Sequence, residues 1–285
     1  MGIHFTTVVV LRINRLSNKT DRNHKCCLIF CTTTTLKSLE LDFNQAAGMS
    51  LSGKTILITG AAGGLGSAIA RQCAGLGADL ILLDKNRRGL GELSDEIAGQ
   101  GFTPPGLYPL NLAAVGVDDF SNLLETIQTE FNGLDALIHC AVDFDSLQPL
   151  EQVQPQDWLQ SMQVNVNAPW LLSCVLLPLL KESGDGRLIF LLDDLESVTD
   201  AYWGAYGTAK AALTGMVRQF DATLGSAQVF VRGIIPGPMR TDFRAKVYHA
   251  ENPMEQPEPS ITARKITTML SDDLSGGDLI LNLSA

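Results

Sequence analysis

Residues 55–66 read TILITGAAGGLG, five apolar or β-branched residues followed by a glycine-rich segment. A short run of this composition predicts a buried β-strand over residues 55–59. The glycines allow a sharp turn and a close approach to a pyrophosphate, and a helix starting near Gly64 would offer free N–H groups and the positive end of its dipole. The segment therefore predicts a dinucleotide-binding strand, turn and helix.

Asp84 lies eighteen residues beyond Gly66, after the next apolar run, where a dinucleotide fold places an acidic residue. A carboxylate there would accept hydrogen bonds from the adenosine ribose and repel a 2′-phosphate, which favours NAD over NADP. The basic neighbours Lys85, Arg87 and Arg88 leave NADP possible. We therefore expect NAD(H), with NADP(H) as the alternative.

Short apolar runs and longer amphipathic stretches alternate through the rest of the chain. The expected strands are residues 55–59, 79–83, 106–110, 136–140, 187–192, 228–235 and 279–281. The expected helices are residues 64–76, 90–98, 118–131, 158–180, 202–224 and 261–270. Strands that are apolar almost throughout are buried on both faces, as in a parallel sheet covered by helices. We predict a single α/β domain, a Rossmann-like doubly wound parallel sheet of about seven strands with helices on both faces.

Residues 164–180 are apolar almost all round, and they include Pro169 and Pro178. This stretch is shorter than the roughly 20 residues needed to span a bilayer, so no membrane association is expected. A helix without a polar face is buried or packs on a partner. We therefore expect a subunit interface formed by the helices at 158–180 and 202–224, in a homodimer or homotetramer.

Composition excludes several classes of function. Of the 285 residues 45% are hydrophobic and 18% charged, which excludes a disordered chain. The net charge of −10 repels phosphate backbones and anionic lipid, so nucleic acid is not an expected partner. Six cysteines without a Cys-x-x-Cys pair are too few for a disulfide scaffold of this length, which favours a reducing, cytoplasmic setting.

The first 48 residues differ from the rest, with six basic against three acidic residues and no sustained helical or strand period. We expect the folded domain to span 49–285 and residues 1–48 to be an N-terminal extension, either disordered or a misassigned start. An organellar transit peptide is the alternative, whereas the apolar runs are too short for a secretory signal. Four possible metal ligands here fit no zinc spacing, so no metal site is expected: His24, Cys26, Cys27 and Cys31.

Tyr206 and Lys210 are four residues apart and therefore share one face of the predicted helix. An adjacent ammonium lowers the pKa of a tyrosine, which suits general acid/base chemistry. Upstream lies the pattern Thr59-Gly60-x-x-x-Gly64-x-Gly66, and downstream lies PGPMRT over residues 236–241. In this order and spacing, from Leu51 to about Asn282, the chain resembles the short-chain dehydrogenase/reductase family.

The resemblance implies hydride transfer between a nicotinamide and a carbonyl or alcohol carbon of a small molecule. Tyr206 would be the general acid/base, and Lys210 would lower its pKa and hold the nicotinamide ribose. Asn165 would support a water in the proton relay, and Thr241 would contact the nicotinamide carboxamide. The cofactor-binding residues that the resemblance implies are Gly60, Gly64, Leu65, Gly66, Asp84, Asn111, Ala141, Lys210, Pro236, Gly237 and Thr241.

Asp193 lies thirteen residues before Tyr206, where the family has a substrate-orienting serine. A carboxylate about 4 Å from a phenolate costs on the order of 4 kcal/mol at an effective dielectric near 20, which opposes the effect of Lys210. Asp193 could instead be protonated and donate a hydrogen bond, or Ser197 could replace the serine. The alternative function is a catalytically impaired relative that holds a dinucleotide as a sensor or assembly partner.

Other departures lie around the expected cofactor. His139-Cys140-Ala141-Val142 stands where the family has Asn-Asn-Ala-Gly, and the valine is expected to crowd the cofactor. We expect His139 to be packed or in contact with the cofactor, not a base, since no carboxylate partner is near in sequence. Asn111 replaces an aspartate that contacts adenine, and its amide oxygen can still accept a hydrogen bond. The loop 242–259, with three prolines, is expected to act as a lid.

Overall fold

The computed structural model describes residues 49–225, 229–270 and 278–284. The expected N-terminal extension 1–48, with its four possible metal ligands, lies outside the described residues. So does residue 228, the first residue of the sixth expected strand.

Seven strands of the described residues form one parallel sheet in the order β3-β2-β1-β4-β5-β6-β7. The strands are β1 Thr55–Thr59, β2 Asp79–Asp84, β3 Gly106–Pro109, β4 Ala136–His139, β5 Gly186–Leu191, β6 Val229–Ile235 and β7 Ile280–Asn282. The order reverses between β1 and β4, which pair from Ile56 opposite Ala136. In such sheets ligands bind beyond the carboxyl ends of the strands at this reversal. The doubly wound parallel sheet predicted from the sequence is confirmed.

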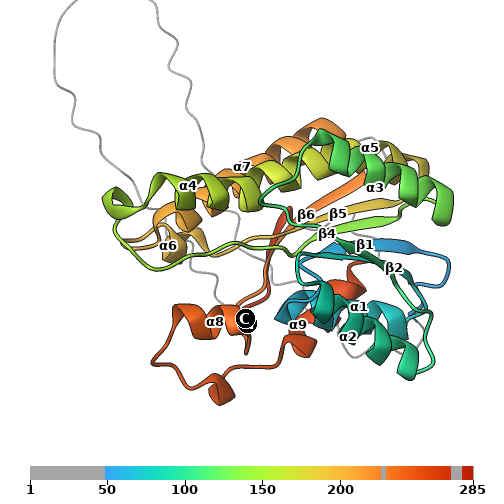
Figure 1. The fold of residues 1–285 in the computed structure, drawn as a ribbon, viewed down its shortest axis with the longest axis horizontal. Helices are drawn as coiled ribbons and strands as arrows, with labels where there is room; N and C mark the ends of the chain where they lie inside the picture. The colour runs from blue at the N-terminus through green and yellow to red at the C-terminus, as the bar shows by residue number, and fades with distance from the viewer. Residues whose placement is uncertain (1–48, 226–228, 271–277, 285) are drawn as a thin grey trace, which may run out of the picture. The chain divides into compact units, whose positions relative to one another are not determined.

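Helices cover both faces of the sheet (Figure 1). One face carries α1 Gly64–Gly75, α2 Arg87–Gly99 and α9 Pro259–Thr268, and the other carries α3 Val117–Glu130, α5 Ala168–Glu182 and α7 Gly204–Leu224. Every residue of β1 is buried, and its side chains alternate between the two cores. Ile56 and Ile58 pack under α1, α2 and α9, while Leu57 packs under the other layer. Burial on both faces explains why the strand reads as a continuous apolar run.

The helix expected at 158–180 begins earlier and is not uniform. It starts as α4 Pro155–Met162, passes through a π-helical segment Gln163–Asn167 and continues as α5. Proline at the first helical position favours the earlier start because its missing N–H would have no partner there. Of the described helices, only the run Pro155–Glu182 is long and apolar enough to cross a membrane. Half of its most apolar window is buried within the protein, and core helices pass the same test.

The segment 242–259, expected as a loop, contains the short helix α8 Asp242–Val247 and a 3-10 turn Pro253–Glu255. Thr241 caps α8, since its Oγ1 accepts a hydrogen bond from Arg244 N at 3.2 Å. Pattern analysis missed this helix because six residues are too few to show a period. Two further short elements were also missed, η1 Leu150–Gln152 and α6 Leu195–Val198.

Candidate active site

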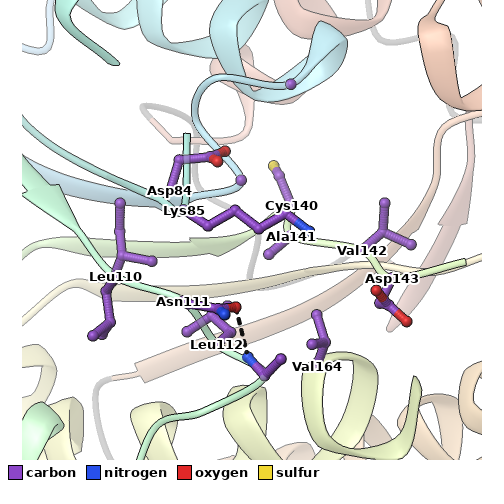
Figure 2. Close-up of a pocket in the computed structure, with 14 residues that line it drawn as sticks. Asp84, Lys85, Leu110, Asn111, Leu112, Cys140, Ala141, Val142, Asp143 and Val164 are labelled. Atoms are coloured by element: carbon purple, nitrogen blue, oxygen red, sulfur yellow. Dashed lines mark hydrogen bonds between the residues drawn. The ribbon is translucent and has the colours of Figure 1, made fainter. Parts of the chain in front are cut away.

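Two adjoining pockets, of about 150 and 230 Å³, open at the carboxyl ends of the strands, where the sheet order reverses. Gly60, Gly63, Cys140 and Val142 line both pockets, which therefore form one cleft. The first pocket lies beside the ends of β2 and β4 (Figure 2). The second holds residues from the ends of β5 and β6, from α7 and from α8. The cleft thus gathers residues from eight separate segments of the sequence.

The glycine-rich turn has no room for side chains. Gly60 has φ +64°, and a Cβ there would lie 2.7 Å from Ala141 Cα. A Cβ on Gly66 would lie 2.2 Å from the Gly60 carbonyl oxygen, and one on Gly64 would lie 2.6 Å from Thr241 Cγ2. No side chain of the described residues caps the start of α1 at Gly63. Free N–H groups at a helix start with close backbone access fit a dinucleotide pyrophosphate.

The first pocket holds Asp84 and Asn111 (Figure 2). Asp84 Oδ2 accepts a hydrogen bond from Ala62 N at 3.0 Å, and its Oδ1 accepts one from Asn86 N at 2.8 Å. Asn111 Oδ1 accepts one from Ala113 N at 3.1 Å. The Asp84 carboxylate therefore braces both the glycine-rich turn and the start of α2 while it lines the pocket.

The ends of β1 and β4 are joined by a side chain that sequence reasoning missed. Thr59 Oγ1 accepts hydrogen bonds from Cys140 N and Ala141 N, both at 3.2 Å. This contact fixes Ala141 and the exposed Val142 at the floor of the cleft. Burial raises the pKa of the Cys140 thiol to about 12, so the thiol stays protonated and is no nucleophile at neutral pH.

His139 lies outside both pockets. Its Nε2 is 2.9 Å from Ser173 Oγ, and its ring stacks on Phe190 with centroids 4.7 Å apart. Burial lowers the pKa of His139 to about 3, so the imidazole is neutral. The side chain packs α5 against the sheet.

Tyr206, Lys210 and Asp193 meet in the second pocket. Tyr206 Oη donates a hydrogen bond to Asp193 Oδ2. Lys210 Nζ lies 3.7 Å from that same oxygen and donates to the Leu191 carbonyl at 2.9 Å. Tyr206 is only 4% exposed, whereas the Asp193 side chain is 30% exposed. The carboxylate is thus the polar group of the three that is most open to the cleft.

The electrostatics differ from what the resemblance implies for Lys210. Burial, and after it the Asp193 carboxylate, raise the pKa of Tyr206 well above its usual 10. Burial also lowers the pKa of Lys210, and Asp193 opposes that effect. The expected lowering of the Tyr206 pKa by Lys210 is therefore outweighed. The phenol remains protonated and donates to the carboxylate.

Ser197 does not replace the missing serine in this arrangement. Its Oγ donates to Asp194 Oδ2 at 2.7 Å, and Asp194 Oδ1 accepts from Glu196 N at 3.2 Å. Asp194 is the N-cap of α6, so both groups are engaged at a helix start. Asp193, and not Ser197, faces Tyr206.

Asn165 lies in the π-helical segment and lines neither pocket. Its Oδ1 accepts from Asp143 N at 2.9 Å, and its Nδ2 donates to the Asp143 carbonyl at 2.8 Å and to Ser161 Oγ at 3.0 Å. The buried amide thus fixes the segment that follows β4. The structure does not bring it into the cleft with Tyr206.

The far wall of the second pocket comes from the segment after β6 and contains Pro236, Gly237 and Thr241. Gly237 has φ +76°, and a Cβ there would lie 2.9 Å from Ser284 Cα, so the position requires glycine. Leu65 completes the pocket from the start of α1. The start of α1 and the segment after β6 therefore line the same pocket.

Aromatic rings surround Tyr206, and sequence reasoning missed them. The centroid of Tyr206 lies 5.5 Å from Phe144, 5.6 Å from Trp203 and 5.7 Å from Phe243. Phe144 and Phe243 are themselves 5.7 Å apart. The rings come from segments after β4 and β6 and from the start of α7, so no spacing in the sequence could reveal them. We call Phe144, Trp203, Tyr206 and Phe243 the aromatic cluster.

Comparisons with known proteins agree with this geometry. The family model for short chain dehydrogenase matches residues 54–252. YciK of Escherichia coli (strain K12), described as an uncharacterised oxidoreductase, is 32% identical over 223 residues, which are 78% of this chain and 88% of that protein. A protein of Pseudomonas syringae described as a short chain dehydrogenase has a solved structure with 37% identity and a TM-score of 0.76, over 81% of this chain and 95% of that one.

A further similar structure carries a cofactor. It is described as a short chain dehydrogenase of Escherichia coli CFT073 complexed with NADPH, with 30% identity and a TM-score of 0.77 over 81% of this chain and 96% of that one. The relatives and the cradle at the glycine-rich turn agree on a nicotinamide cofactor. The chain therefore belongs to the short-chain dehydrogenase/reductase family of oxidoreductases.

Proposed function

We propose that the protein is an NADP(H)-dependent oxidoreductase that moves hydride between the nicotinamide and a carbonyl or alcohol carbon of a small molecule. One observation carries the proposal. Tyr206, Lys210 and Asp193 meet in a cleft that also contains an open glycine-rich turn. A proton-bearing group beside a dinucleotide cradle is what reversible hydride transfer to a polar carbon needs.

NADP(H) replaces NAD(H) as the preferred cofactor, and two kinds of support favour the change. A relative that matches most of this chain binds NADPH. Lys85 lines the first pocket, and the exposed Arg87 begins α2 without an ion pair among the described residues. Arg88 is already paired with Glu92 at 2.7 Å. Lys85 in the pocket and Arg87 at the nearby start of α2 therefore favour a 2′-phosphate despite the Asp84 carboxylate.

Residues of this chain would bind the cofactor and position the phenol of Tyr206. The cofactor, when bound, supplies or accepts the hydride. Free N–H groups at the start of α1 would hold its pyrophosphate, and Pro236, Gly237 and Thr241 would form the wall beside its nicotinamide. Lys210 would bind the ribose of the nicotinamide, while Tyr206 presents its phenol through the hydrogen bond to Asp193. The segment 242–259 would close the cleft as a lid.

A homodimer or homotetramer in the cytoplasm remains our expectation. Leu159 of α4 and Trp170 of α5 are 66% and 51% exposed, and both belong to the helical run Pro155–Glu182. Large exposed apolar side chains on one helical run favour an interface between subunits. Sedimentation of the protein, with Trp170→Glu as the variant, would test this assembly.

The alternative is a relative that holds the dinucleotide without turnover. The raised pKa of Tyr206 is the observation on its side, since a phenol that stays protonated is a poor base. We rank it second because the glycine-rich turn, Tyr206, Lys210, Pro236 and Gly237 line one pocket, which supports a role in turnover.

Calorimetric titration of the full chain with NADPH and NADH, followed by turnover assays, tests the proposal. We expect micromolar binding of NADPH, weaker binding of NADH, and turnover that Tyr206→Phe lowers while NADPH still binds, because the Asp193 carboxylate loses a hydrogen-bond donor. Binding without turnover of any carbonyl, alcohol or imine substrate would favour the alternative. No binding of either dinucleotide by the folded protein would overturn both functions.

A further inference from the structure

We propose that the natural substrate carries a protonated C=N bond, an iminium, whose N–H donates a hydrogen bond to the Asp193 carboxylate. The inference rests on the hydride transfer proposed above, and it replaces the carbonyl or alcohol carbon of that proposal with the carbon of a C=N bond. It is carried by three features of the described residues: a free carboxylate oxygen, a phenol whose proton is already engaged, and the aromatic cluster.

One carboxylate oxygen of Asp193, Oδ1, is available to a ligand. Both contacts described above, from Tyr206 Oη and from Lys210 Nζ, reach Oδ2. Oδ1 accepts no hydrogen bond from any described residue, yet the side chain is 30% exposed and lines the second pocket. A carboxylate oxygen with free lone pairs accepts hydrogen bonds and donates none. It therefore favours a ligand that brings its own N–H, and most of all a cationic one.

A carbonyl substrate fits these groups poorly. When hydride reaches a carbonyl carbon, negative charge develops on the oxygen and calls for a donor or a proton. The Tyr206 hydroxyl already donates its hydrogen bond to Asp193, so it is not available to the substrate oxygen. The carboxylate would also repel the developing alkoxide. Release of that proton would leave a phenolate beside a carboxylate, which the raised pKa of Tyr206 opposes.

An iminium substrate avoids both the repulsion by Asp193 and the need for a proton from Tyr206. Its nitrogen is positive before the reaction and neutral after it, so no proton has to leave Tyr206. A carboxylate within about 4–6 Å favours the charged form of a base, so Asp193 would keep the imine protonated and reactive. The Tyr206 hydroxyl then fixes the carboxylate in place and does not serve as the acid.

The surroundings also suit a cation. Tyr206 and Phe243 line the pocket with rings 5.7 Å apart, and aromatic faces attract cations. Four charged side chains line this pocket: Asp193, Lys210, Asp242 and Arg244. Arg244 is neutralised by Glu251, whose two carboxylate oxygens accept from its guanidinium at 2.5 and 2.8 Å. Asp193 and Asp242 then face a single cation, Lys210, and the pocket is net negative.

The reaction balances without another reagent. A C–H bond of the reduced nicotinamide would break, and its hydride would form a new C–H bond at the iminium carbon. The π pair of the C=N bond becomes the lone pair of the nitrogen. The iminium is thereby reduced to an amine, and the nicotinamide is oxidised. Solvent supplies the proton that later makes the amine an ammonium ion. Asp193 acts throughout as a hydrogen-bond acceptor, and Tyr206 keeps its proton.

Binding to the full chain saturated with NADP⁺ is the first test, with piperidinium chloride as the cationic probe and cyclohexanol as its neutral counterpart. We expect calorimetry to show piperidinium binding at least about tenfold tighter than cyclohexanol. Asp193→Asn keeps the shape of the side chain and removes its charge. It should lower the affinity for piperidinium at least about tenfold while NADP⁺ still binds. Asp242→Asn removes a carboxylate from the same pocket and should change piperidinium affinity less than about threefold.

Turnover gives the second readout, with 1-pyrroline against cyclopentanone at pH 7. The natural protein should reduce the imine faster, and Asp193→Ser should shift the ratio toward the ketone. Equal affinity for the two probes, equal losses in the two aspartate variants, or faster ketone turnover would overturn the inference. So would the failure of both probes to bind the NADP⁺ complex. None of these outcomes touches the proposed oxidoreductase function, which fails only if NADPH does not bind or if no substrate of any class is turned over.

Discussion

The Tyr206 hydroxyl donates its hydrogen bond to Asp193 Oδ2, so the phenol that the family resemblance casts as a general acid has its proton directed into a carboxylate. The two residues are thirteen apart in sequence, one after β5 and the other in the first turns of α7. Lys210 sits 3.7 Å from the shared oxygen and holds the carboxylate between two donors. The ionisation of this tyrosine is therefore controlled chiefly by burial and by Asp193.

Replacement of Asp193 by serine should lower the pKa of Tyr206, because it removes a negative charge beside the phenol and an acceptor of its proton. A pH titration of tyrosine Cζ signals by NMR would measure the shift, with Tyr206→Phe to assign the resonance. Asp194→Ser is the matched control, since Asp194 pairs with Ser197 and not with Tyr206. A resonance that titrates identically in Asp193→Ser and in the natural protein would show that the carboxylate has no such influence.

Much of this arrangement was predictable because it is local. The strand at 55–59 and the glycines after it carry their geometry in adjacent residues, and the four-residue spacing of Tyr206 and Lys210 fixes a shared helix face. The family resemblance, by a count of thirteen residues, directed attention to Asp193, which contacts Tyr206 in the structure. The strand and the shared helix face could therefore be predicted from neighbouring residues alone, and the structure contains both.

The rest depends on contacts between distant segments. The aromatic cluster draws Phe144, Trp203 and Phe243 from three segments. Thr59 accepts hydrogen bonds from the backbone just after β4, more than eighty residues away in sequence. The role of Asn165 in fixing the segment after β4 also depends on a π-helical turn, which no apolar period predicts. Tertiary packing decides such features, and a single sequence does not reveal it.

Cofactor preference should depend on Lys85 and Arg87. Each alanine variant is expected to lower the affinity for NADPH by about tenfold, which corresponds to the loss of one hydrogen bond to a charged group. The affinity for NADH should change by less than about threefold. Calorimetric titration at two salt concentrations measures both effects. Arg88→Ala is the control, because Arg88 already pairs with Glu92. Parallel losses for both dinucleotides would mean that these cations do not face a 2′-phosphate.

Gly66→Ala should disable the cofactor cradle. Its Cβ would lie 2.2 Å from the Gly60 carbonyl oxygen, so the turn must move and the free N–H groups at the start of α1 move with it. We expect a lower melting temperature and a loss of NADPH affinity of at least about tenfold. Gly91→Ala, in α2 with nothing within 4 Å of the added Cβ, should instead stabilise by about 0.5–1 kcal/mol. Retained NADPH affinity in Gly66→Ala would contradict the assigned cradle.

His139 should make the protein sensitive to acid. Burial lowers its pKa from 6.5 to about 3, so the unfolded chain binds a proton between these values and the folded chain does not. Stability is therefore lost as pH falls through this window, by about 3 kcal/mol between pH 7 and pH 4 from this group. Urea unfolding at several pH values would show the slope.

His139→Asn removes the titrating group and keeps a polar side chain opposite Ser173, so its free energy of unfolding should fall less between pH 7 and pH 4 than that of the natural protein. The same substitution at an exposed histidine, His249→Asn, is the matched control. Ser173→Ala removes the partner of the imidazole without removing its titration, and should lower stability by a similar amount at both pH values. If His139→Asn and the natural protein lost stability in parallel, the neutral buried imidazole would not be the source of the acid sensitivity.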